Sequence, residues 1–401
     1  MIERTEGLKK YKGFIGILLL LVVAFVYAMF QGGFVSWFLF YLIVPLSIYS
    51  ILLFFYPLSK IEAERIIETR KVYSGGRFSA TVRVTRNNRF PLLFVWFEER
   101  VGPSLRHTGS RRQLVFWGIK KEFTWTYEIE HMPRGEHVLE GTTIEVSDLF
   151  GWMKKSIFIS NPKTLLVFPN LTDMIYIPME TRYDQGAAAS RIQVMKDTTM
   201  ATGVRSYQPG DRVSWIHWKS FARTQTLKTK EFEDRQSQDL FILIDRTLTP
   251  MFEDVVDLSA SIMQAIVRHQ ASSAFLSLGE DRFFLPNVEN ETQLHQVLYH
   301  LTKVQPDLNK PIEQVISQEP ALAQATSLLY ITSELTHEWI DGINRNAGNL
   351  RLCRCFVVKN KNEKPNKNET ALYQYAKSRG VDAHNITKDR FAQAFMEVNR
   401  S

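Results

Sequence analysis

Two long apolar runs at the start of the chain constrain its fold more than any other feature. Residues 14–30 are apolar or small without interruption, and residues 35–58 form a second run that only three serines and two prolines interrupt. Each run is long enough to cross a hydrocarbon core as a helix, which takes about 20 residues. Because only a short glycine-containing turn separates the runs, we predict a transmembrane helical hairpin over residues 1–59.

The charges around these runs predict their orientation. Basic residues precede the first run and follow the second, whereas the turn has none; they are Arg4, Lys9, Lys10, Lys12, Lys60 and Arg65. The positive-inside rule therefore predicts a two-pass protein of the cell membrane with both termini in the cytoplasm. A cleaved signal peptide is the alternative for the first run, but that run is long and no small-x-small cleavage site follows it.

Residues 60–170 alternate polar with apolar or aromatic side chains, the pattern of half-buried strands. The alternation is clearest at 78–85, 93–99, 123–130 and 137–146, with turn residues such as Gly75-Gly76 and Asn87-Asn88 between the runs. Short strands spaced in this way predict an antiparallel β-sandwich. Residues 171–200 include a stretch of low complexity, and we expect a connector there with poor order around 183–198.

The positive charge of the chain is unevenly placed. The formal net charge is +7, and residues 60–163 alone carry eighteen Lys or Arg against twelve Asp or Glu. This excess follows the apolar runs, where anionic headgroups attract each basic side chain by about 1 kcal/mol. The placement favours a lipid surface over nucleic acid, since a nucleic-acid-binding chain would be expected to carry its basic stripe in the distal domain.

Beyond residue 239, short apolar runs alternate with helical patterns. Strands are predicted at 241–244, 274–278, 327–331 and 353–358, and helices at 252–270, 291–304, 369–378 and 390–398. This alternation predicts a parallel sheet covered on both faces over residues 240–401. Cys353 and Cys355 fall in one predicted strand, which indicates reduced buried thiols rather than a disulfide framework or a metal site.

Residues 201–239 hold a segment that no generic fold requires, with a Pro209-Gly210-Asp211 turn and two tryptophans among several basic residues. The segment closely resembles the signature of the domain-of-unknown-function-58 family. Matching positions are Gly203, Arg205, Tyr207, Gly210, Asp211, Ile216, Trp218, Ala222, Arg223, Leu227, Lys230 and Glu233. Ser214 departs from the signature, which usually has Arg there. Asp148-Leu-Phe-Gly151 resembles a second family landmark, D-P-F-G, with Leu149 in place of proline.

The resemblance implies that residues 240–401 form a Rossmann-type, von Willebrand factor A-like α/β domain. Such domains carry D-x-S-x-S after the first strand, where oxygen atoms help to bind Mg²⁺. Asp245, Thr247 and Thr249 keep these oxygens, but Ser333 stands where a second carboxylate is expected. Because Mg²⁺ prefers carboxylate and hydroxyl oxygens in near-octahedral geometry, we expect a degenerate metal or partner rim at these four residues, with weak Mg²⁺ binding at most, at Asp245 and Thr247.

The signature segment has two possible roles. Exposed Trp and Arg side chains often anchor protein interfaces. Alternatively, Trp215 and Trp218 lie three positions apart, so a helix would place both on one face, buried between domains. We favour the buried role, and the two roles are compatible. His217 is expected to be a packed or hydrogen-bonded residue.

No enzymatic motif stands out. The sequence has no H-x-x-x-H pair, no G-x-S-x-G elbow and no glycine-rich phosphate loop, so we expect no catalytic residues and no cofactor. Asp148 and Asp211 are conceivable as an acid–base pair, but their spacing does not bring them together.

Members of the resembled family commonly occur beside MoxR-type AAA ATPases and transglutaminase-like membrane proteins. The resemblance therefore implies a membrane-anchored cytoplasmic scaffold or adaptor, with such an ATPase and neighbouring membrane proteins as partners, in a chaperone-like or assembly role. Arg205, Asp211, Trp218 and Arg223 are expected beneath or beside the rim. Two alternatives stay open: a hydrolytic enzyme that uses the signature segment, and a basic surface that binds anionic lipid or nucleic acid.

Overall fold

A computed structural model describes residues 2–67, 71–106, 111–178, 201–208, 213–232, 240–308, 312–322, 325–346, 350–361, 363 and 366–398. The chain divides into two compact units. The first comprises Met1–Asn170 with Leu301–Lys303, and the second comprises Leu171–His300 with Val304–Ser401.

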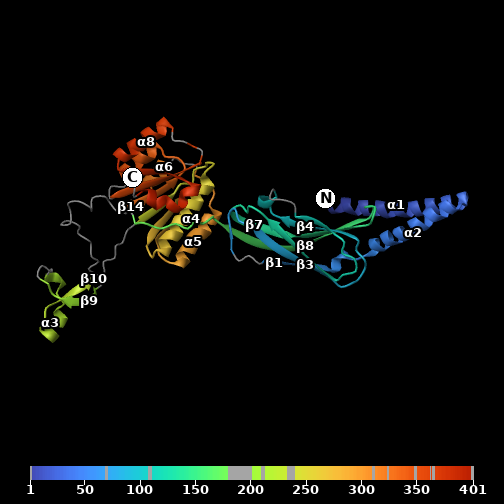
Figure 1. The fold of residues 1–401 in the computed structure, drawn as a ribbon, viewed down its shortest axis with the longest axis horizontal. Helices are drawn as coiled ribbons and strands as arrows, with labels where there is room; N and C mark the ends of the chain where they lie inside the picture. Colours follow the sequence, from blue (N-terminus) through green and yellow to red (C-terminus); the bar gives the residue numbers. More distant parts are fainter. Residues whose placement is uncertain are drawn as a thin grey trace. The chain divides into compact units, whose positions relative to one another are not determined.

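Two apolar helices open the first unit, α1 (Ile2–Gln31) and α2 (Phe34–Phe55) (Figure 1). The segments Gly13–Gln31 and Phe34–Phe55 are long and apolar enough to cross a membrane. Gly32, at φ 62°, makes the turn between the helices in a conformation that favours glycine. The second apolar helix ends at Phe55 rather than at the predicted residue 58, because Pro57 disfavours helical backbone at the residue before it.

Eight strands follow in the first unit and form what we call the β body. They are β1 (Ile61–Ile67), β2 (Val72–Tyr73), β3 (Phe78–Arg86), β4 (Phe94–Val101), β5 (Arg112–Val115), β6 (Glu122–Ile129), β7 (Gly135–Ser147) and β8 (Lys154–Phe168). They form a three-stranded sheet β1-β3-β6 and a five-stranded sheet β2-β8-β7-β4-β5. All neighbours are antiparallel except β2 and β8. The predicted runs correspond to β3, β4, β6 and β7.

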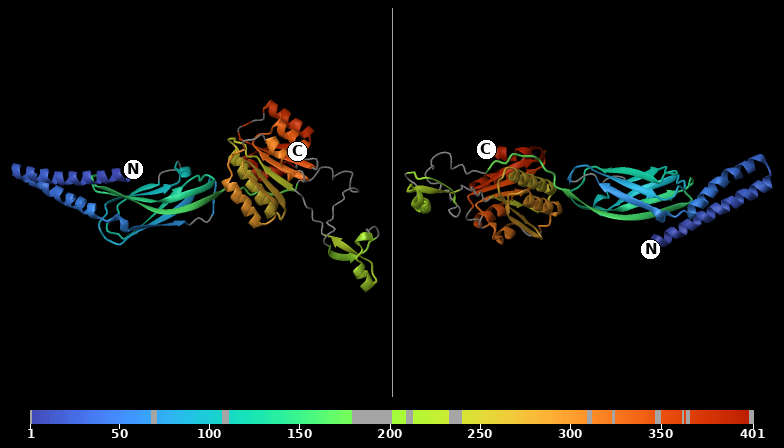
Figure 2. Two further views of the ribbon diagram at one scale, coloured as in Figure 1. Left: turned by 180° about the vertical axis from the view of Figure 1, so that it is seen from behind. Right: turned by 90° about the horizontal axis from the view of Figure 1, so that it is seen from below.

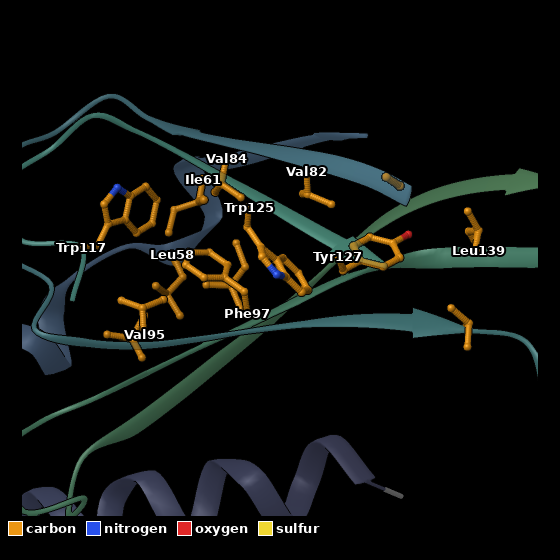
Figure 3. Close-up of a cluster of buried hydrophobic side chains, with 14 of the residues drawn as sticks. Leu58, Ile61, Val82, Val84, Val95, Phe97, Trp117, Trp125, Tyr127 and Leu139 are labelled. Atoms are coloured by element: carbon orange, nitrogen blue, oxygen red, sulfur yellow. The ribbon is translucent and has the colours of Figure 1, made fainter. Parts of the chain in front are cut away.

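The inward side chains of both sheets share one apolar cluster, which includes Phe97, Trp117 and Trp125. Figure 3 shows these aromatic rings among the valines of β3 and β4. A charged pair is also buried in the β body: Arg65 on β1 contacts Glu99 on β4, and Thr142 donates a hydrogen bond to the same carboxylate at 2.8 Å. Burial raises the pKa of Glu99 against the opposing effect of Arg65.

The second unit begins with residues that we expected to be part of a connector. Residues 171–178 instead pack along the α/β domain, where Tyr176 is buried and its ring meets Phe395 at 5.2 Å. The backbone N–H of Thr172 donates to Ser261 Oγ at 3.0 Å. The expected poor order around 183–198 concerns residues outside those that the structure describes.

The α/β domain (residues 240–398) is built on six strands. Its strands are β11 (Leu240–Ile244), β12 (Ser273–Leu278), β13 (Arg282–Val288), β14 (Ser327–Thr332), β15 (Leu352–Lys359) and β16 (Val381–Thr387). Its helices are α4 (Phe252–Arg268), α5 (Glu291–Lys303), α6 (Ile312–Ser317), α7 (His337–Asn346), α8 (Lys367–Ser378) and α9 (Ala394–Val398), with a 3₁₀ segment η6 (Lys388–Gln393).

The sheet order is β13-β12-β11-β14-β15-β16, and only the edge strand β13 is antiparallel. One face packs under α6, α7 and α8, where Tyr330 stacks on Trp339 with ring centroids 4.3 Å apart. The other face meets α5 and α9, for example through Phe356 and Phe395. The predicted parallel sheet is therefore present, and Figure 2 shows its helical layers. The single predicted helix at 390–398 is instead η6 followed by α9.

Candidate functional site

The predicted rim lies where β11 and β14 end. These two strands are parallel neighbours and both finish at this edge of the sheet. Strand β11 is also where the strand order changes direction, since β12 lies on one side of it and β14 on the other. Ligands of open α/β sheets bind at such a switch point, so the topology places the rim at a favoured location.

The structure brings the four predicted rim residues together. Asp245 directly follows β11, and its Oδ1 accepts hydrogen bonds from the Thr247 backbone N–H at 2.9 Å and from Thr247 Oγ1 at 2.7 Å. Its Oδ2 accepts a bond of 2.5 Å from Thr332 Oγ1. Ser333 Oγ in turn donates to Thr249 Oγ1 at 2.9 Å. We use "rim" for Asp245, Thr247, Thr249, Thr332 and Ser333.

Buried neighbours hold the rim loop from below. Arg246 is buried, forms an ion pair with Asp307 and donates to the backbone oxygen of Asp281 at 3.0 Å. Burial lowers the pKa of Arg246, and the nearby carboxylates oppose that effect. Tyr330 lies under the rim on β14, and burial, followed by the Asp245 carboxylate, raises its pKa well above the ordinary value. These contacts fix the loop backbone.

The donor set of the rim does not fit a firm Mg²⁺ site. The rim has one carboxylate, both oxygens of which already accept hydrogen bonds from Thr247 and Thr332. Glu334 is exposed, and its N–H bonds back to Thr332 Oγ1 at 3.1 Å. Among the described residues, no group of three or more His, Cys, Asp or Glu could hold a metal ion. The geometry describes a closed hydroxyl cluster.

The rim nevertheless presents an apolar side chain to solvent. Leu248 lies between Thr247 and Thr249 in the rim loop and is 77% exposed. The hydroxyls on either side point inward to their own partners, as the hydrogen bond from Thr247 to Asp245 shows. An exposed leucine on a rigid polar loop can contact another protein, but the loop holds no group arranged for acid–base or nucleophilic chemistry.

The signature segment forms a small lobe of its own, which we call the signature lobe (residues 201–208 and 213–232). It contains β9 (Ala201–Ser206), a 3₁₀ turn η4 (Val213–Trp215), α3 (Trp218–Thr224) and β10 (Lys228–Phe232). Strands β9 and β10 are antiparallel, so Gly203, Arg205 and Lys230 lie on one two-stranded ribbon. The described core of the lobe is small and includes Ile216 and Thr229.

His217 explains where the helix of the lobe begins. Its Nδ1 accepts a hydrogen bond from the Ser220 N–H at 3.1 Å, so the imidazole caps the first turn of α3. The prediction of a hydrogen-bonded histidine is confirmed. The cap also separates the tryptophans: Trp215 ends the 3₁₀ turn and Trp218 begins the helix, so they do not share one helical face as we expected.

Of the two tryptophans expected to be buried, Trp218 is exposed on the lobe and Trp215 is partly buried. Trp218 is 59% exposed, and its ring meets Phe221 edge-on at 6.1 Å. Leu227 and Val204 are also exposed, and Arg223 lies in the last turn of the helix. The lobe itself does not enclose Trp218, because seven helical residues on a two-stranded ribbon are too few to cover a tryptophan, and its burial between domains stays a prediction.

Some predicted residues lie outside the described part of the chain, and others were missed. Gly210 and Asp211 belong to the first group. Thr332 was missed although it ends an apolar run, and the alternation along β14 places it on the same side as Tyr330. Phe221 was also missed; its spacing of three from Trp218 within a helix was the available signal.

Comparisons with known proteins agree with the signature. The family described as "Protein of unknown function DUF58" matches residues 203–400. The uncharacterised protein YeaD of Bacillus subtilis is 34% identical over 329 residues, which cover 80% of this chain and 82% of that protein.

Solved structures add little. The crystal structure of a protein assigned as ApaA from Bordetella pertussis shares 12% identity, covers 27% of this chain and 91% of that one, and has a TM-score of 0.20. The sporulation control protein Spo0M from Bacillus subtilis shares 13% identity, covers 27% and 49% of the two chains, and has a TM-score of 0.13. Neither likeness carries an argument about fold.

On the evidence of the signature residues, the matched region and the Bacillus relative, the chain belongs to the DUF58 family.

Proposed function

We propose that this protein is a membrane-anchored cytoplasmic scaffold or adaptor that binds other proteins. The observation that carries the proposal is the surface of the signature lobe. It combines exposed aromatic and aliphatic side chains, Trp218, Phe221 and Leu227, with the basic residue Arg223. Trp and Arg are the residues most enriched among those that dominate binding energy at protein interfaces. A small lobe that leaves them in solvent gains nothing from them for its own folding.

The partner that we propose is a MoxR-type AAA ATPase, with neighbouring membrane proteins as further partners, in a chaperone-like or assembly role. The support is the family resemblance together with the character of the lobe surface. Each basic side chain beside the aromatic pair, such as Arg223, favours an acidic partner surface through steering and specificity. The rim, with Leu248 exposed on a rigid loop, is a second candidate contact.

The finer architecture is part of the same proposal. The sheet order with one antiparallel edge strand supports a von Willebrand factor A-like domain. Two mostly antiparallel sheets that share one apolar cluster support a β-sandwich. Both are scaffolds on which binding loops are carried, and a function must be argued from the site rather than from either fold.

Cross-linking from the lobe tests the partner proposal. A photoreactive phenylalanine analogue at position 218 of the full-length protein, in its native membrane, should capture a defined protein that mass spectrometry identifies. The matched control carries the analogue at Tyr299, an exposed aromatic position on α5. Capture of the same protein from both positions, or of none from position 218, would contradict the proposal. Capture of a protein other than an AAA ATPase would keep the scaffold role and reject this partner.

The proposed topology has a separate test. We propose two membrane spans, α1 and α2, with both termini in the cytoplasm, on the basis of helix length and charge asymmetry. A reporter fused after Ser401 should be active only in its cytoplasmic form. A reporter inserted between Gly32 and Gly33 should be active only in its external form. External activity of the C-terminal fusion would reject the localisation and the class of partner with it.

A further inference from the structure

Two loops of the β body lie against the base of the helical hairpin. The turn between β7 and β8 (residues 148–153) meets α1, where a Cβ on Gly13 would overlap with the backbone oxygen of Trp152. The same turn meets α2, where Ser50 Oγ donates a 2.8 Å hydrogen bond to Asp148 Oδ2. Gly13 begins the first apolar segment and Ser50 lies near the end of the second. The turn is thus at the level where the apolar segments begin.

That turn exposes three large apolar side chains. Leu149, Phe150 and Trp152 are 50%, 57% and 44% exposed. The rings of Phe150 and Trp152 lie 5.7 Å apart, so they form one patch. Gly151, at φ 69°, allows the tight turn, and its N–H bonds to the Asp148 oxygen at 3.3 Å. A turn built in this way holds its apolar side chains outward on a rigid backbone.

A second loop of the β body, between β5 and β6, also lies beside α2. Tyr49 of α2 accepts a hydrogen bond from the Leu93 N–H at 3.2 Å. Leu92 is bonded through its backbone to Gly118, which places the loop of residues 116–120 beside this contact. Phe116 and Ile119 in that loop are 69% and 64% exposed. Two separate loops beside the hairpin therefore present apolar side chains to their surroundings.

Basic residues flank both loops. Lys120 and Lys121 follow the second loop, and Lys154 and Lys155 follow the turn. Lys155 Nζ donates to the backbone oxygen of Phe54 at 3.0 Å, so this ammonium lies at the end of α2. Aromatic side chains that sit at the headgroup level with lysines beside them are typical of a membrane interface. Exposed apolar patches mark contacts with proteins or membranes, and the place of these two loops beside the base of the apolar hairpin favours a membrane.

We infer that the end of the β body nearest the hairpin is itself a membrane-binding surface. Leu149, Phe150 and Trp152, with Phe116 and Ile119, enter the headgroup region of an anionic bilayer, while the exposed Lys120, Lys121 and Lys154 contact the lipid phosphates. The inference rests on the proposed insertion of α1 and α2. It adds a third and fourth point of contact, which hold the β body down on the lipid surface instead of leaving it suspended from two helices.

Site-specific fluorophores test this in the full-length protein, reconstituted into vesicles of phosphatidylcholine and phosphatidylglycerol. Single labels are placed at Phe150→Cys, at Val138→Cys as the control, and at Leu19→Cys as a reference in α1. Val138 is exposed on β7, nine residues before its end, and so about 30 Å from the turn at roughly 3.3 Å per residue. The native Cys353 and Cys355 are buried and take little label.

The expected pattern separates the three sites. Lipids with a nitroxide near the headgroup should quench the label at 150 several-fold more than the label at 138, and aqueous iodide should quench them in the reverse order. Deep nitroxides should quench the label at 19. If 19 is quenched and 150 behaves like 138, the interfacial contact is rejected and the membrane anchor stands. If 19 is quenched only by iodide, the anchor itself is rejected. A further outcome is that the label at 150 is protected from iodide only at high protein density, without being quenched by lipid nitroxide. That result would show that a second copy of the protein covers the turn, and it would also overturn the inference.

Discussion

The signature lobe precedes strand β11 and the rim loop follows it, yet the side chains of the two regions differ in how far they are satisfied within the protein. In the rim, the polar groups satisfy one another: Asp245, Thr247 and Thr332 form a closed set of hydrogen bonds. In the lobe, Trp218 and Phe221 lie in solvent with basic residues around them. The polar groups of the rim are thus satisfied within the protein, whereas the aromatic side chains of the lobe remain exposed.

This difference separates positions kept for folding from positions available for binding. A buried polar group without a partner costs free energy, so the rim residues hold each other in place. An exposed tryptophan contributes little to the fold that carries it, and its surface gains free energy only when another molecule covers it. The lobe is therefore the better candidate for docking, although the rim lies at the favoured switch point of the sheet.

The largest expected effect contrasts two tryptophans. Trp339→Ala should lower the free energy of unfolding of the α/β domain by about 3–5 kcal/mol, because the ring is buried and stacked on Tyr330. Trp218→Ala should change it by less than about 0.5 kcal/mol, as exposed substitutions usually do. Hydrogen exchange of peptides from β14 in the full-length protein measures both. Equal losses would show that Trp218 is buried in solution and would remove the contrast.

The next effect concerns the closure of the rim. Asp245→Ala removes the acceptor for three donors, two on Thr247 and one on Thr332, and should destabilise the domain by about 2 kcal/mol. Asp245→Asn keeps the size and one acceptor and should cost less. Thermal unfolding of the purified protein in detergent compares them. If Asp245→Ala left the melting temperature unchanged, water would satisfy these donors and the rim would be open.

A smaller effect isolates one hydrogen bond. Thr332→Val keeps the shape of the side chain but removes the hydroxyl that donates to Asp245 Oδ2 and accepts from the Glu334 N–H. We expect a loss of about 1 kcal/mol. In the Asp245→Ala background, Thr332→Val should lower the free energy of unfolding by clearly less, because the Asp245 carboxylate that accepts from the Thr332 hydroxyl is already absent. Additive losses in this double-mutant cycle would show that the two residues are not coupled.

The smallest effect is that of Mg²⁺. With one carboxylate already occupied by hydrogen bonds, we expect binding on the order of millimolar and stabilisation below about 1 kcal/mol. Following the melting temperature during a titration tests this, with Ser333→Asp as the variant that restores a second carboxylate. A rise of many degrees in the parent, abolished in Asp245→Ala, would show a working metal site and would make the rim as open to ligands as the lobe.

The elements that could be predicted from the sequence are those marked by runs of apolar residues. Four strands of the α/β domain, β11, β12, β14 and β15, and the two apolar helices follow from apolar runs, because burial on both faces of a sheet or a length sufficient to cross a hydrocarbon core requires such runs. The two edge strands β13 (Arg282–Val288) and β16 (Val381–Thr387) were missed, since each is only partly buried and neither is a continuous apolar run. In the candidate site, Asp245 and its threonines could be predicted from spacing. Thr332 could not, because its role depends on two strands that are far apart in the chain.

The exposure of Trp218 was unpredictable for a different reason. A spacing of three residues indicates a shared face only within one helix, and the cap at His217 begins the helix after Trp215. Large aromatic residues are also usually buried, and the lobe by itself does not bury this one. Whether a tryptophan is covered depends on how much chain is available to enclose it, and the signature lobe is too small.

The junction between α2 and β1 has a mechanical consequence. Only Tyr56 and Pro57 separate the helix from the 3₁₀ turn η1 (Leu58–Lys60) that leads into β1. Lys155 donates hydrogen bonds to the carbonyl oxygens of Phe54 and Tyr56, and Ser50 donates one to Asp148. These bonds restrict rotation of the β body relative to α2. Spanning helices change their tilt with bilayer thickness. With α2 spanning a bilayer as proposed, a change in its tilt passes through this joint to the β body, and the loops that hold the β body on the lipid surface oppose that change.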